Sequence, residues 1–227
     1  CKAQADLNNL EGAKESLEQS LEVNENDVMS HFNLAQIHIE EKAFMKSLFH
    51  LKEAERLCPS DPYIHSNMAY VMFKLEDVEG ALYKYKQALA LGENPDWMTT
   101  VAQTIGTIYH QVYSDKTRAM EYFQKALDYK PNNVEAWTSS AQLNYETGKL
   151  EDALICYRHL LEYMPNNPEC YCNIGYILWQ LDRNDQAIDA YQIALRMAPD
   201  NAIAKNNLGV IYLDDKYNAE EALRLFE

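Results

Sequence analysis

Side-chain amides recur in this sequence at a spacing that suits peptide recognition. Asn33 and Asn67 are 34 residues apart, and Asn173 and Asn207 are separated by the same distance. An Asn amide carries a donor and an acceptor on one planar group, so it can bond both the N–H and the C=O of an extended peptide. We therefore predict a binding site for an extended protein segment at these four residues. The alternative is that these amides only keep a surface hydrated.

Aromatic and acidic side chains add to this candidate peptide-binding site. Large rigid rings bury much area at a small entropic cost, which makes them good anchors for a bound segment. The aromatic candidates are Tyr70, Phe73, Tyr145, Tyr176 and Trp179. A ligand that bears Lys or Arg would be favoured by the carboxylates of Glu135, Glu146 and Glu169. In each case the alternative is structural: rings that pack between helices, and carboxylates that form a solvated rim.

Residue patterns for catalysis or cofactor binding are missing. The sequence has no phosphate-binding loop, no nucleophile elbow and no HExxH zinc motif. His31 and His65 recur 34 residues apart, and His38 follows nearby, but such histidines more often replace a core aromatic residue than bind metal. Cys170 and Cys172 are two residues apart and would diverge on a helix. We therefore predict no enzyme activity, no cofactor and no metal site.

Charge and composition narrow the class of partner. The chain has 20 Lys+Arg against 35 Asp+Glu, a formal net charge of -15, which repels phosphate backbones and argues against nucleic acid as a partner. No apolar run approaches the roughly 18 residues of a membrane helix, so we expect no membrane insertion. Five Cys without metal-type CxxC spacing fit a reducing compartment. A cytoplasmic protein is therefore predicted.

One pattern of residue types is written twice between residues 134 and 202, and it dictates how these side chains are positioned. Its first copy is Trp137, Ala141, Gly148, Ala153, Tyr157 and Pro165. The second copy, 34 residues later, is Tyr171, Gly175, Asp182, Ala187, Tyr191 and Pro199. Small residues allow helices to approach closely, aromatic residues fill the space beside them, and proline ends a helix. A fixed period of this length is typical of stacked helical hairpins.

The register extends over the whole chain. If the first residue of each unit is position 1, units start at 28, 62, 99, 134, 168 and 202, and residues 1–27 fit the last two-thirds of another unit. Position 8 is small in every full unit: Ala35, Ala69, Gly106, Ala141 and Gly175. Position 20 is also small: Ser47, Ala81, Ala119, Ala153 and Ala187. Two antiparallel helices can therefore pack closely in each unit.

These columns resemble the tetratricopeptide repeat over essentially the whole chain. The resemblance implies an all-α fold, a right-handed superhelical solenoid of stacked antiparallel helix pairs, with helix A at positions 1–14 and helix B near 17–30. We expect about thirteen helices in one solenoid over 1–227. It consists of a partial repeat 1–27, repeats 28–61, 62–98, 99–133, 134–167 and 168–201, and a partial repeat 202–227.

Three places depart from this period. One residue is added in the Ser114-Asp115 turn, and another at 214–216. Residues 92–96 add about three more, where Gly92 and Pro95 mark a helix stop and restart. There we expect a local change of superhelical pitch rather than a domain boundary.

The family resemblance also implies that positions 2, 5, 6, 9, 12 and 13 of helix A face a concave groove. The four Asn candidates fall at position 6, where they resemble the asparagine ladder of the O-linked N-acetylglucosamine transferase repeats, interrupted here by Thr104 and Ser139. The aromatic candidates fall at positions 9 and 12. The family's carboxylate clamp needs a basic residue at position 5, and no unit has one.

We predict a non-catalytic protein-interaction scaffold or adaptor that binds an extended protein segment in this groove. Two alternatives stay open. The chain is the substrate-recruiting arm of a larger enzyme such as a glycosyltransferase, or it is a scaffold that self-assembles through exposed repeat ends. Both terminal repeats are incomplete, which indicates a fragment of a longer protein.

Overall fold

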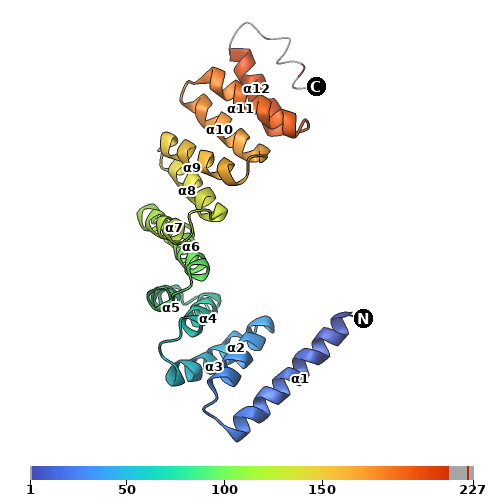
Figure 1. Ribbon diagram of the computed structural model, residues 1–227, viewed down its shortest axis with the longest axis vertical. Helices are drawn as coiled ribbons and strands as arrows, with labels where there is room; N and C mark the ends of the chain where they lie inside the picture. Colours follow the sequence, from blue (N-terminus) through green and yellow to red (C-terminus); the bar gives the residue numbers. More distant parts are fainter. Residues whose placement is uncertain (1, 215–223, 225–227) are drawn as a thin grey trace. The chain divides into compact units, whose positions relative to one another are not determined.

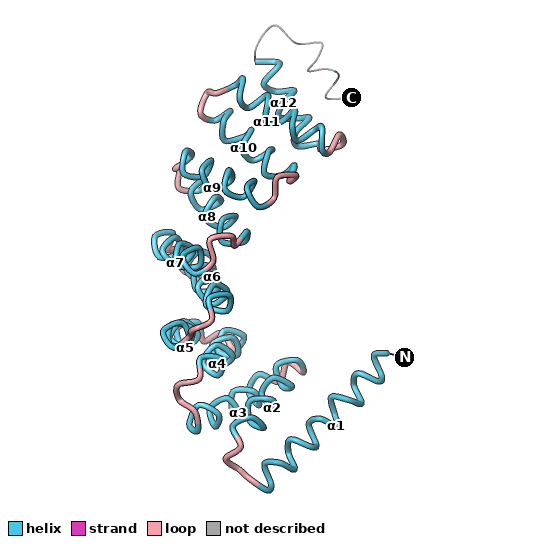
Figure 2. The backbone as a smooth tube through the Cα atoms, in the orientation of Figure 1, coloured by secondary structure: helices cyan, strands magenta, loops and turns pink. Residues whose placement is uncertain are grey.

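The computed structural model describes residues 2–214 and 224, and their regular structure is helical throughout (Figure 1). These residues form twelve α-helices and no strand, joined by short loops and turns (Figure 2). The helices are α1 (Lys2–Val23), α2 (Val28–Glu40), α3 (Phe44–Leu57), α4 (Pro62–Lys74), α5 (Val78–Leu91), α6 (Pro95–Gln111), α7 (Lys116–Tyr129), α8 (Val134–Glu146), α9 (Leu150–Tyr163), α10 (Pro168–Gln180), α11 (Asn184–Met197) and α12 (Ala202–Asp214). The second helix of the last repeat would lie outside the described residues.

The helices pack in pairs, as the repeat pattern predicts. Helix α2 packs on α3, α4 on α5, α8 on α9 and α10 on α11, and each pair is the A and B helix of one repeat (Figure 1). The expected all-α repeat array is therefore confirmed. The chain divides into two compact units, Cys1–Val112 and Tyr113–Glu227, and this division follows α6 rather than the insertion at 92–96. A single solenoid over 1–227 stays a prediction.

Asparagine or aspartate caps the start of each A helix. The capping side chain accepts a hydrogen bond from a backbone N–H of the first turn, which satisfies a donor that has no partner inside the helix. The caps are Asp27, Asp61, Asn94, Asn133, Asn167 and Asn201. Five A helices begin where the register predicts. The exception is α6, which begins at Pro95 rather than at residue 99, because Asn94 caps it and proline is well suited to a first helical turn.

A left-handed residue makes the turn from helix A to helix B. At position 15 this residue is Lys42, Glu76, Gly148 or Asp182, all with positive φ. In the third repeat it is Ser114, one position later, so the predicted one-residue insertion is confirmed there. The second predicted insertion, at 214–216, extends beyond the described residues. In the partial repeat position 15 falls on Asn8, yet α1 runs unbroken from Lys2 to Val23, and no proline interrupts it.

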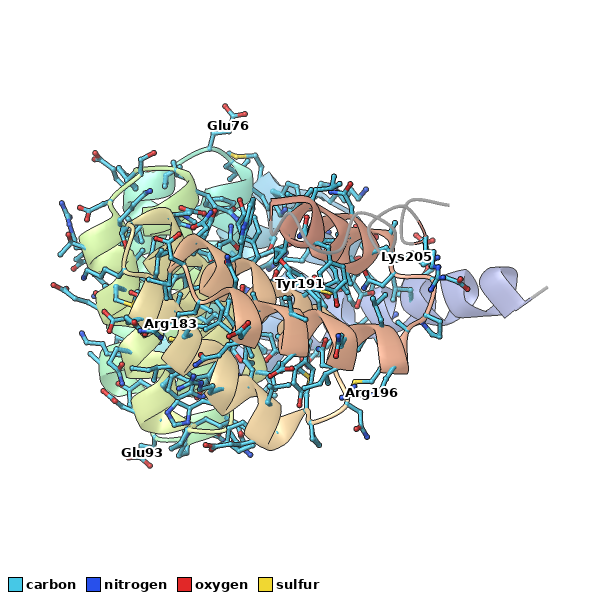
Figure 3. The ribbon with its side chains drawn as sticks, turned by 90° about the horizontal axis from the view of Figure 1, so that it is seen from above. Glu76, Glu93, Arg183, Tyr191, Arg196 and Lys205 are labelled. Atoms are coloured by element: carbon cyan, nitrogen blue, oxygen red, sulfur yellow. The ribbon has the colours of Figure 1, made fainter. Side chains whose placement is uncertain are left out.

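Close helix contact depends on the small residues at the crossing positions. Ala35, Ala69, Ala81, Ala141, Ala153 and Ala187 are completely buried. Gly175 shows the constraint directly: a Cβ atom there would lie 3.0 Å from the ring of Tyr191 (labelled in Figure 3), and Tyr191 is itself completely buried. Where Ser47 replaces alanine, its hydroxyl donates to the Ala35 carbonyl oxygen at 2.9 Å. The predicted role of both columns is therefore confirmed.

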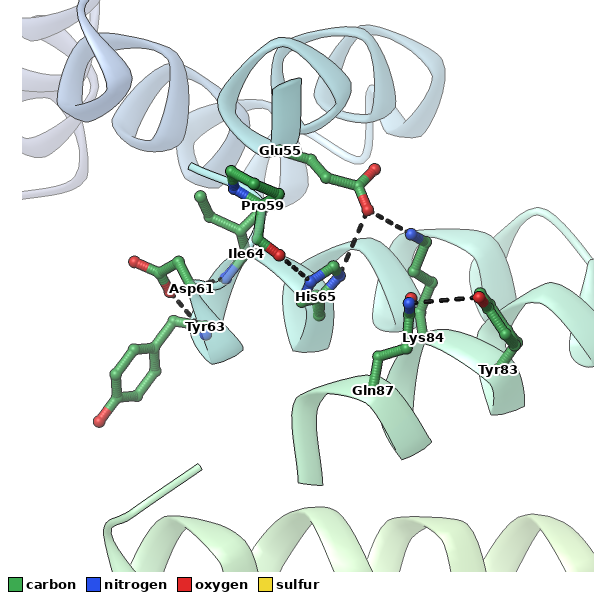
Figure 4. Close-up of polar contacts among 9 residues, drawn as sticks. All are labelled: Glu55, Pro59, Asp61, Tyr63, Ile64, His65, Tyr83, Lys84 and Gln87. Atoms are coloured by element: carbon green, nitrogen blue, oxygen red, sulfur yellow. Dashed lines mark hydrogen bonds and ion pairs between the residues drawn. The ribbon is translucent and has the colours of Figure 1, made fainter. Parts of the chain in front are cut away.

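A ring N–H at position 4 ties three A helices to the end of the preceding repeat. The Nε2 atom of His31 donates to the Glu25 carbonyl oxygen at 3.0 Å. Likewise, Nε2 of His65 donates to the Pro59 carbonyl oxygen at 2.8 Å (Figure 4). Trp137 makes the equivalent bond, to the carbonyl oxygen of Pro131, at 2.8 Å. His31 and His65 thus take the part of an indole N–H, which explains why histidine and tryptophan share this column.

Three histidines meet between α2 and α3. The Nδ1 atoms of His31 and His50 are 3.0 Å apart, and His38 stacks on His50 with ring centroids 5.6 Å apart. Nε2 of His31 donates to a carbonyl oxygen, and in the tautomer that leaves Nδ1 without a proton this atom accepts from Nδ1 of His50. His38 contacts the Glu41 carboxylate at 2.9 Å, which Lys14 of α1 also contacts at 3.1 Å. Burial, with His31 and His38 adding to it, lowers the pKa of His50 to about 4.

Replacing Ala187 with Leu should lower the free energy of unfolding by about 1–3 kcal/mol, because the larger side chain has no space at a completely buried crossing. Urea unfolding followed by far-ultraviolet circular dichroism measures the effect. Gln186→Leu, at the exposed neighbouring position, is the matched control and should change stability by less than about 0.5 kcal/mol. An unchanged midpoint for Ala187→Leu would contradict the assigned crossing.

The free energy of unfolding should fall as the pH is lowered from 6.5 towards 4. The pKa of His50 is about 4 in the folded chain against an ordinary value of 6.5, so between these values the unfolded chain binds more protons and acid favours unfolding. His50→Gln removes the titrating ring and should flatten the pH dependence in this window. His159→Gln, in the other unit, controls for the loss of a histidine. Equal flattening in both variants would show that His50 is not responsible.

Candidate functional site

All the predicted binding residues lie at positions 2, 6, 9, 12 and 13 of the A helices. We term these surfaces the N-terminal A face, on α2, α4 and α6, and the C-terminal A face, on α8, α10 and α12. The first carries Asn33, Asn67, Tyr70 and Phe73. The second carries Glu135, Tyr145, Glu146, Glu169, Asn173, Tyr176, Trp179 and Asn207. Each of these residues is at least partly exposed, so each is accessible on its own face.

A hollow of about 470 Å³ opens between α4 and α6 on the N-terminal A face. Its volume lies within the range of roughly 300–1,000 Å³ that is usual for ligand pockets. Two predicted residues, Tyr70 and Phe73, line it. The hollow is also lined by Lys74, Tyr85, Gln103, Thr104, Ile108 and Gln111. We term this space the α4–α6 hollow.

Polar groups lie beside the aromatic lining of the hollow. The Lys74 ammonium lies 5.4 Å from the centroid of the Tyr70 ring, a distance suited to a cation–π contact. Tyr85 comes from helix α5 and is only 7% exposed. Burial, with a smaller contribution from Tyr70, raises the pKa of Tyr85 to about 12. Its phenol therefore keeps its proton at neutral pH and serves as a hydrogen-bond donor.

The position-6 side chains of the N-terminal A face are partly engaged within their own helices. Asn67 donates from Nδ2 to the Tyr63 carbonyl oxygen at 2.8 Å. Thr104, which interrupts the asparagine column, donates to the Thr100 carbonyl oxygen at 2.9 Å. Asn33 is half-buried and makes no side-chain hydrogen bond with a described residue. A continuous ladder of peptide-binding amides therefore stays a prediction, and Asn67 has one amide proton fewer to offer.

On the C-terminal A face, Asn207 has a structural partner. Its Nδ2 donates to the hydroxyl oxygen of Tyr191 at 3.2 Å, and burial raises the pKa of that phenol well above its ordinary value. Asn173 is half-buried and forms no such bond with a described residue. Of these two ladder candidates, Asn173 is therefore the one with its amide free.

Three of the predicted aromatic residues form one cluster on α8 and α10. The ring centroids of Tyr145 and Tyr176 are 5.9 Å apart, and those of Tyr176 and Trp179 are 6.0 Å apart. Gln180 donates to the Tyr145 hydroxyl at 3.0 Å, and hydrogen bonding with Tyr145 raises the pKa of Tyr176. The three rings are half-buried and pack against the core of their unit. These three side chains therefore pack against the core and still keep part of their surface exposed for a ligand.

The predicted carboxylates differ in how free they are. Glu146 accepts from Gln142 at 2.9 Å and lies 3.5 Å from the Lys116 ammonium. Glu135 and Glu169 are exposed in the first turns of α8 and α10, where the helix dipole favours negative charge. Neither forms an ion pair with a described residue. Only these two are therefore free to meet a basic ligand.

Sequence reasoning missed the contributions of Tyr85, on helix B, and of Lys74, at position 13, to the lining of the hollow. Neither residue was singled out from the sequence as a binding residue. The sequence does contain a signal for this difference. Tyr85 and Tyr191 share position 24, but position 6 of the following repeat is Thr104 after Tyr85 and Asn207 after Tyr191. The difference becomes visible only when positions 24 and 6 are compared together.

The described residues offer no group of three or more His, Cys, Asp or Glu that could hold a metal ion. Cys170 and Cys172 are buried free thiols, and burial raises the pKa of each. Within the same described part of the chain, no helix is both long enough and apolar enough to span a membrane.

Comparison with known protein families decides which class of repeat this is. Sequence models of the tetratricopeptide repeat match residues 172–227, residues 141–182, and residues 2–27 together with 114–133. These matches together span more than half of the chain. The chain belongs to the tetratricopeptide-repeat family. The resemblance drawn from the residue columns is therefore confirmed.

Solved structures of tetratricopeptide-repeat proteins share the fold at low sequence identity. YrrB, described as having an unusual peptide-binding site, is 21% identical with a TM-score of 0.66, covering 84% of this chain and 96% of its own. The C-terminal part of a repeat protein from Cytophaga hutchinsonii is 15% identical with a TM-score of 0.81, covering 97% and 90%. A repeat protein from Parabacteroides merdae is 22% identical with a TM-score of 0.61, covering 98% and 86%. These likenesses show the fold alone, and a comparison with curated protein sequences gives no match.

Replacing Asn207 with Ala should lower the free energy of unfolding by about 1–3 kcal/mol, because the buried hydroxyl of Tyr191 loses its partner. Asn173→Ala removes the corresponding amide on α10 and should leave stability nearly unchanged. In a Tyr191→Phe background the loss caused by Asn207→Ala should shrink, since no hydroxyl is left unsatisfied. Urea unfolding of the four variants measures this, and equal losses for Asn173→Ala and Asn207→Ala would refute the assignment.

Proposed function

We propose that this tetratricopeptide-repeat protein is a non-catalytic interaction scaffold that binds extended segments of partner proteins on its A faces. The observation that carries the proposal is the α4–α6 hollow. It is a space of ligand size on the face that the family resemblance assigns to binding, and it is lined by the predicted residues Tyr70 and Phe73. Aromatic side chains with exposed area in a concave site are the usual anchors of protein recognition.

An extended segment matches the spacing of such a surface. Packed helices lie about 8–10 Å apart, and an extended chain advances about 3.3 Å per residue. A segment that crosses from one A helix to the next therefore offers about every third side chain to successive sites. The repeated positions of the A helices suit this regular arrangement better than they suit a compact ligand.

Several finer features belong to the same proposal. The free carboxylates of Glu135 and Glu169 support a basic group in any segment bound on the C-terminal A face. The described cysteines Cys58, Cys156, Cys170 and Cys172 are free thiols, which supports a reducing, cytoplasmic location. Recruitment of substrates to a larger enzyme would use the same faces. Self-association through the repeat ends is a separate hypothesis, and concentration-dependent mass measurement tests it.

Peptides selected from a displayed random library on the whole chain should lose affinity when an anchor is removed. Phe73→Ala should weaken peptides bound on the N-terminal A face by about 10-fold or more, and Trp179→Ala should do so for peptides on the C-terminal A face. Fluorescence anisotropy of labelled peptides measures the dissociation constants.

Tyr83→Ala is the matched control. Tyr83 is an aromatic residue of helix α5 that is 61% exposed and does not line the hollow, so its removal should leave affinity unchanged. Circular dichroism checks that each variant keeps its helicity. If folded Phe73→Ala and Trp179→Ala bind every selected peptide as tightly as the original chain, the A faces are not the binding surfaces and the proposal fails.

A further inference from the structure

The charges of the α4–α6 hollow are opposite to those of the chain as a whole. The chain has 35 Asp+Glu against 20 Lys+Arg, yet no acidic residue lines the hollow, and Lys74 is the lining residue that carries a full charge. The Lys74 ammonium lies over the Tyr70 ring and forms no ion pair with a described residue. The hollow therefore presents an uncompensated cation beside apolar and aromatic walls.

A second donor in the hollow also lacks a partner. Tyr85 and Tyr191 occupy the same position of their repeats, and the hydroxyl oxygen of Tyr191 accepts from Nδ2 of Asn207, on the following A helix, at 3.2 Å. The residue equivalent to Asn207 beside Tyr85 is Thr104, whose hydroxyl donates to the Thr100 carbonyl oxygen instead. Tyr85 is 7% exposed, and its hydroxyl forms no hydrogen bond with a described residue.

The Tyr85 hydroxyl is not one of the fully enclosed polar atoms without a partner among the described residues, so it is open to the hollow and can donate to an acceptor placed there. Tyr85 and Thr104 both line the hollow, so the space left by the shorter threonine is the space where an acceptor can reach the phenol. Burial raises the pKa of Tyr85 to about 12, so its proton is available at neutral pH. Tyr70 lies close to both donors, under the Lys74 ammonium and within electrostatic reach of Tyr85.

We propose that the α4–α6 hollow receives a carboxylate-bearing side chain, Glu or Asp, of the extended partner segment, with the Tyr85 hydroxyl and the Lys74 ammonium as its donors. This inference rests on the proposed function of the same face. Phe73 and Ile108 would pack against the aliphatic part of that side chain. Gln103 and Gln111 form no side-chain hydrogen bond with a described residue, so their amides are free for the backbone of the segment.

The net charge of the chain does not oppose this pairing at physiological salt. Charges further away than the Debye length of about 8 Å are largely screened, whereas a carboxylate inside the hollow meets its donors directly. Charge-assisted hydrogen bonds are roughly twice as strong as neutral ones. A Gln side chain of the same shape can accept a hydrogen bond from Tyr85 but has no charge with which to form an ion pair with Lys74. The difference in affinity between a peptide with Glu and the same peptide with Gln therefore measures the contribution of the charge.

The test selects peptides on the whole chain from a displayed random library and discards those that also bind the Phe73→Ala variant. The probe is the synthetic peptide of highest affinity that remains, together with its Glu→Gln or Asp→Asn counterpart. We expect an acidic residue at a constant place in the selected peptides, and about 10-fold weaker binding of the amide counterpart. Lys74→Met should remove most of this difference, and Tyr85→Phe should reduce it.

Lys52→Met, an exposed lysine of α3 outside the hollow, removes the same charge and should leave the difference intact. Tyr85→Phe deletes only a hydroxyl without a described partner, so its urea midpoint should stay unchanged and poor folding cannot explain weaker binding. Phe73-dependent peptides without an acidic residue, or an acid–amide difference that survives Lys74→Met, would overturn this inference and leave the proposed function standing. A library that yields no peptide dependent on Phe73 or Trp179 would overturn both.

Discussion

The close crossing of the A and B helices is the contact on which the rest of the structure depends. Where Gly175 meets Tyr191, even one added carbon atom would lie 3.0 Å from the ring, and Ala187 has no exposed surface. This contact fixes the rotation of helix A about its own axis. Since residues three or four apart share a face of a helix, positions 5 and 12 lie near the side that position 8 packs inward, whereas positions 2, 6, 9 and 13 are turned away from it. The binding faces are therefore a consequence of packing.

Hydrogen bonds at the repeat junctions complete this arrangement. A helix start exposes backbone donors and a helix end exposes backbone acceptors, and both must be satisfied where repeats stack closely. An Asn or Asp cap serves the donors, and a ring N–H at position 4 serves a carbonyl oxygen of the preceding repeat. His65 and Trp137 make that bond at the same distance of 2.8 Å. Position 4 thus keeps a ring N–H donor although its residue type changes between His and Trp.

Much of the fold could be predicted from the sequence because the crossing positions leave so few choices. The helix pairs, their register and the residue added in the Ser114-Asp115 turn all follow from the spacing of small residues. The start of α6 at Pro95 did not follow, since it depends on the Asn94 cap in an irregular stretch. The availability of the amides did not follow either. Asn67 and Asn207 share a column, but one bonds its own helix and the other a neighbouring phenol, and only three-dimensional neighbours decide between these partners.

In a repeat array, a binding site is best sought where one position keeps its residue type while the position that contacts it in the next repeat changes. In the repeat of Tyr191 the following Asn207 donates to the phenol oxygen, and the ring is completely buried. In the repeat of Tyr85 the shorter Thr104 donates to its own helix, so the Tyr85 hydroxyl has no described partner and a space lies beside it. The two repeats act as an internal control, since they share the crossing contact and differ in this pair. Threonine in place of asparagine at this position therefore removes a hydrogen bond from the fold and leaves room for a ligand atom.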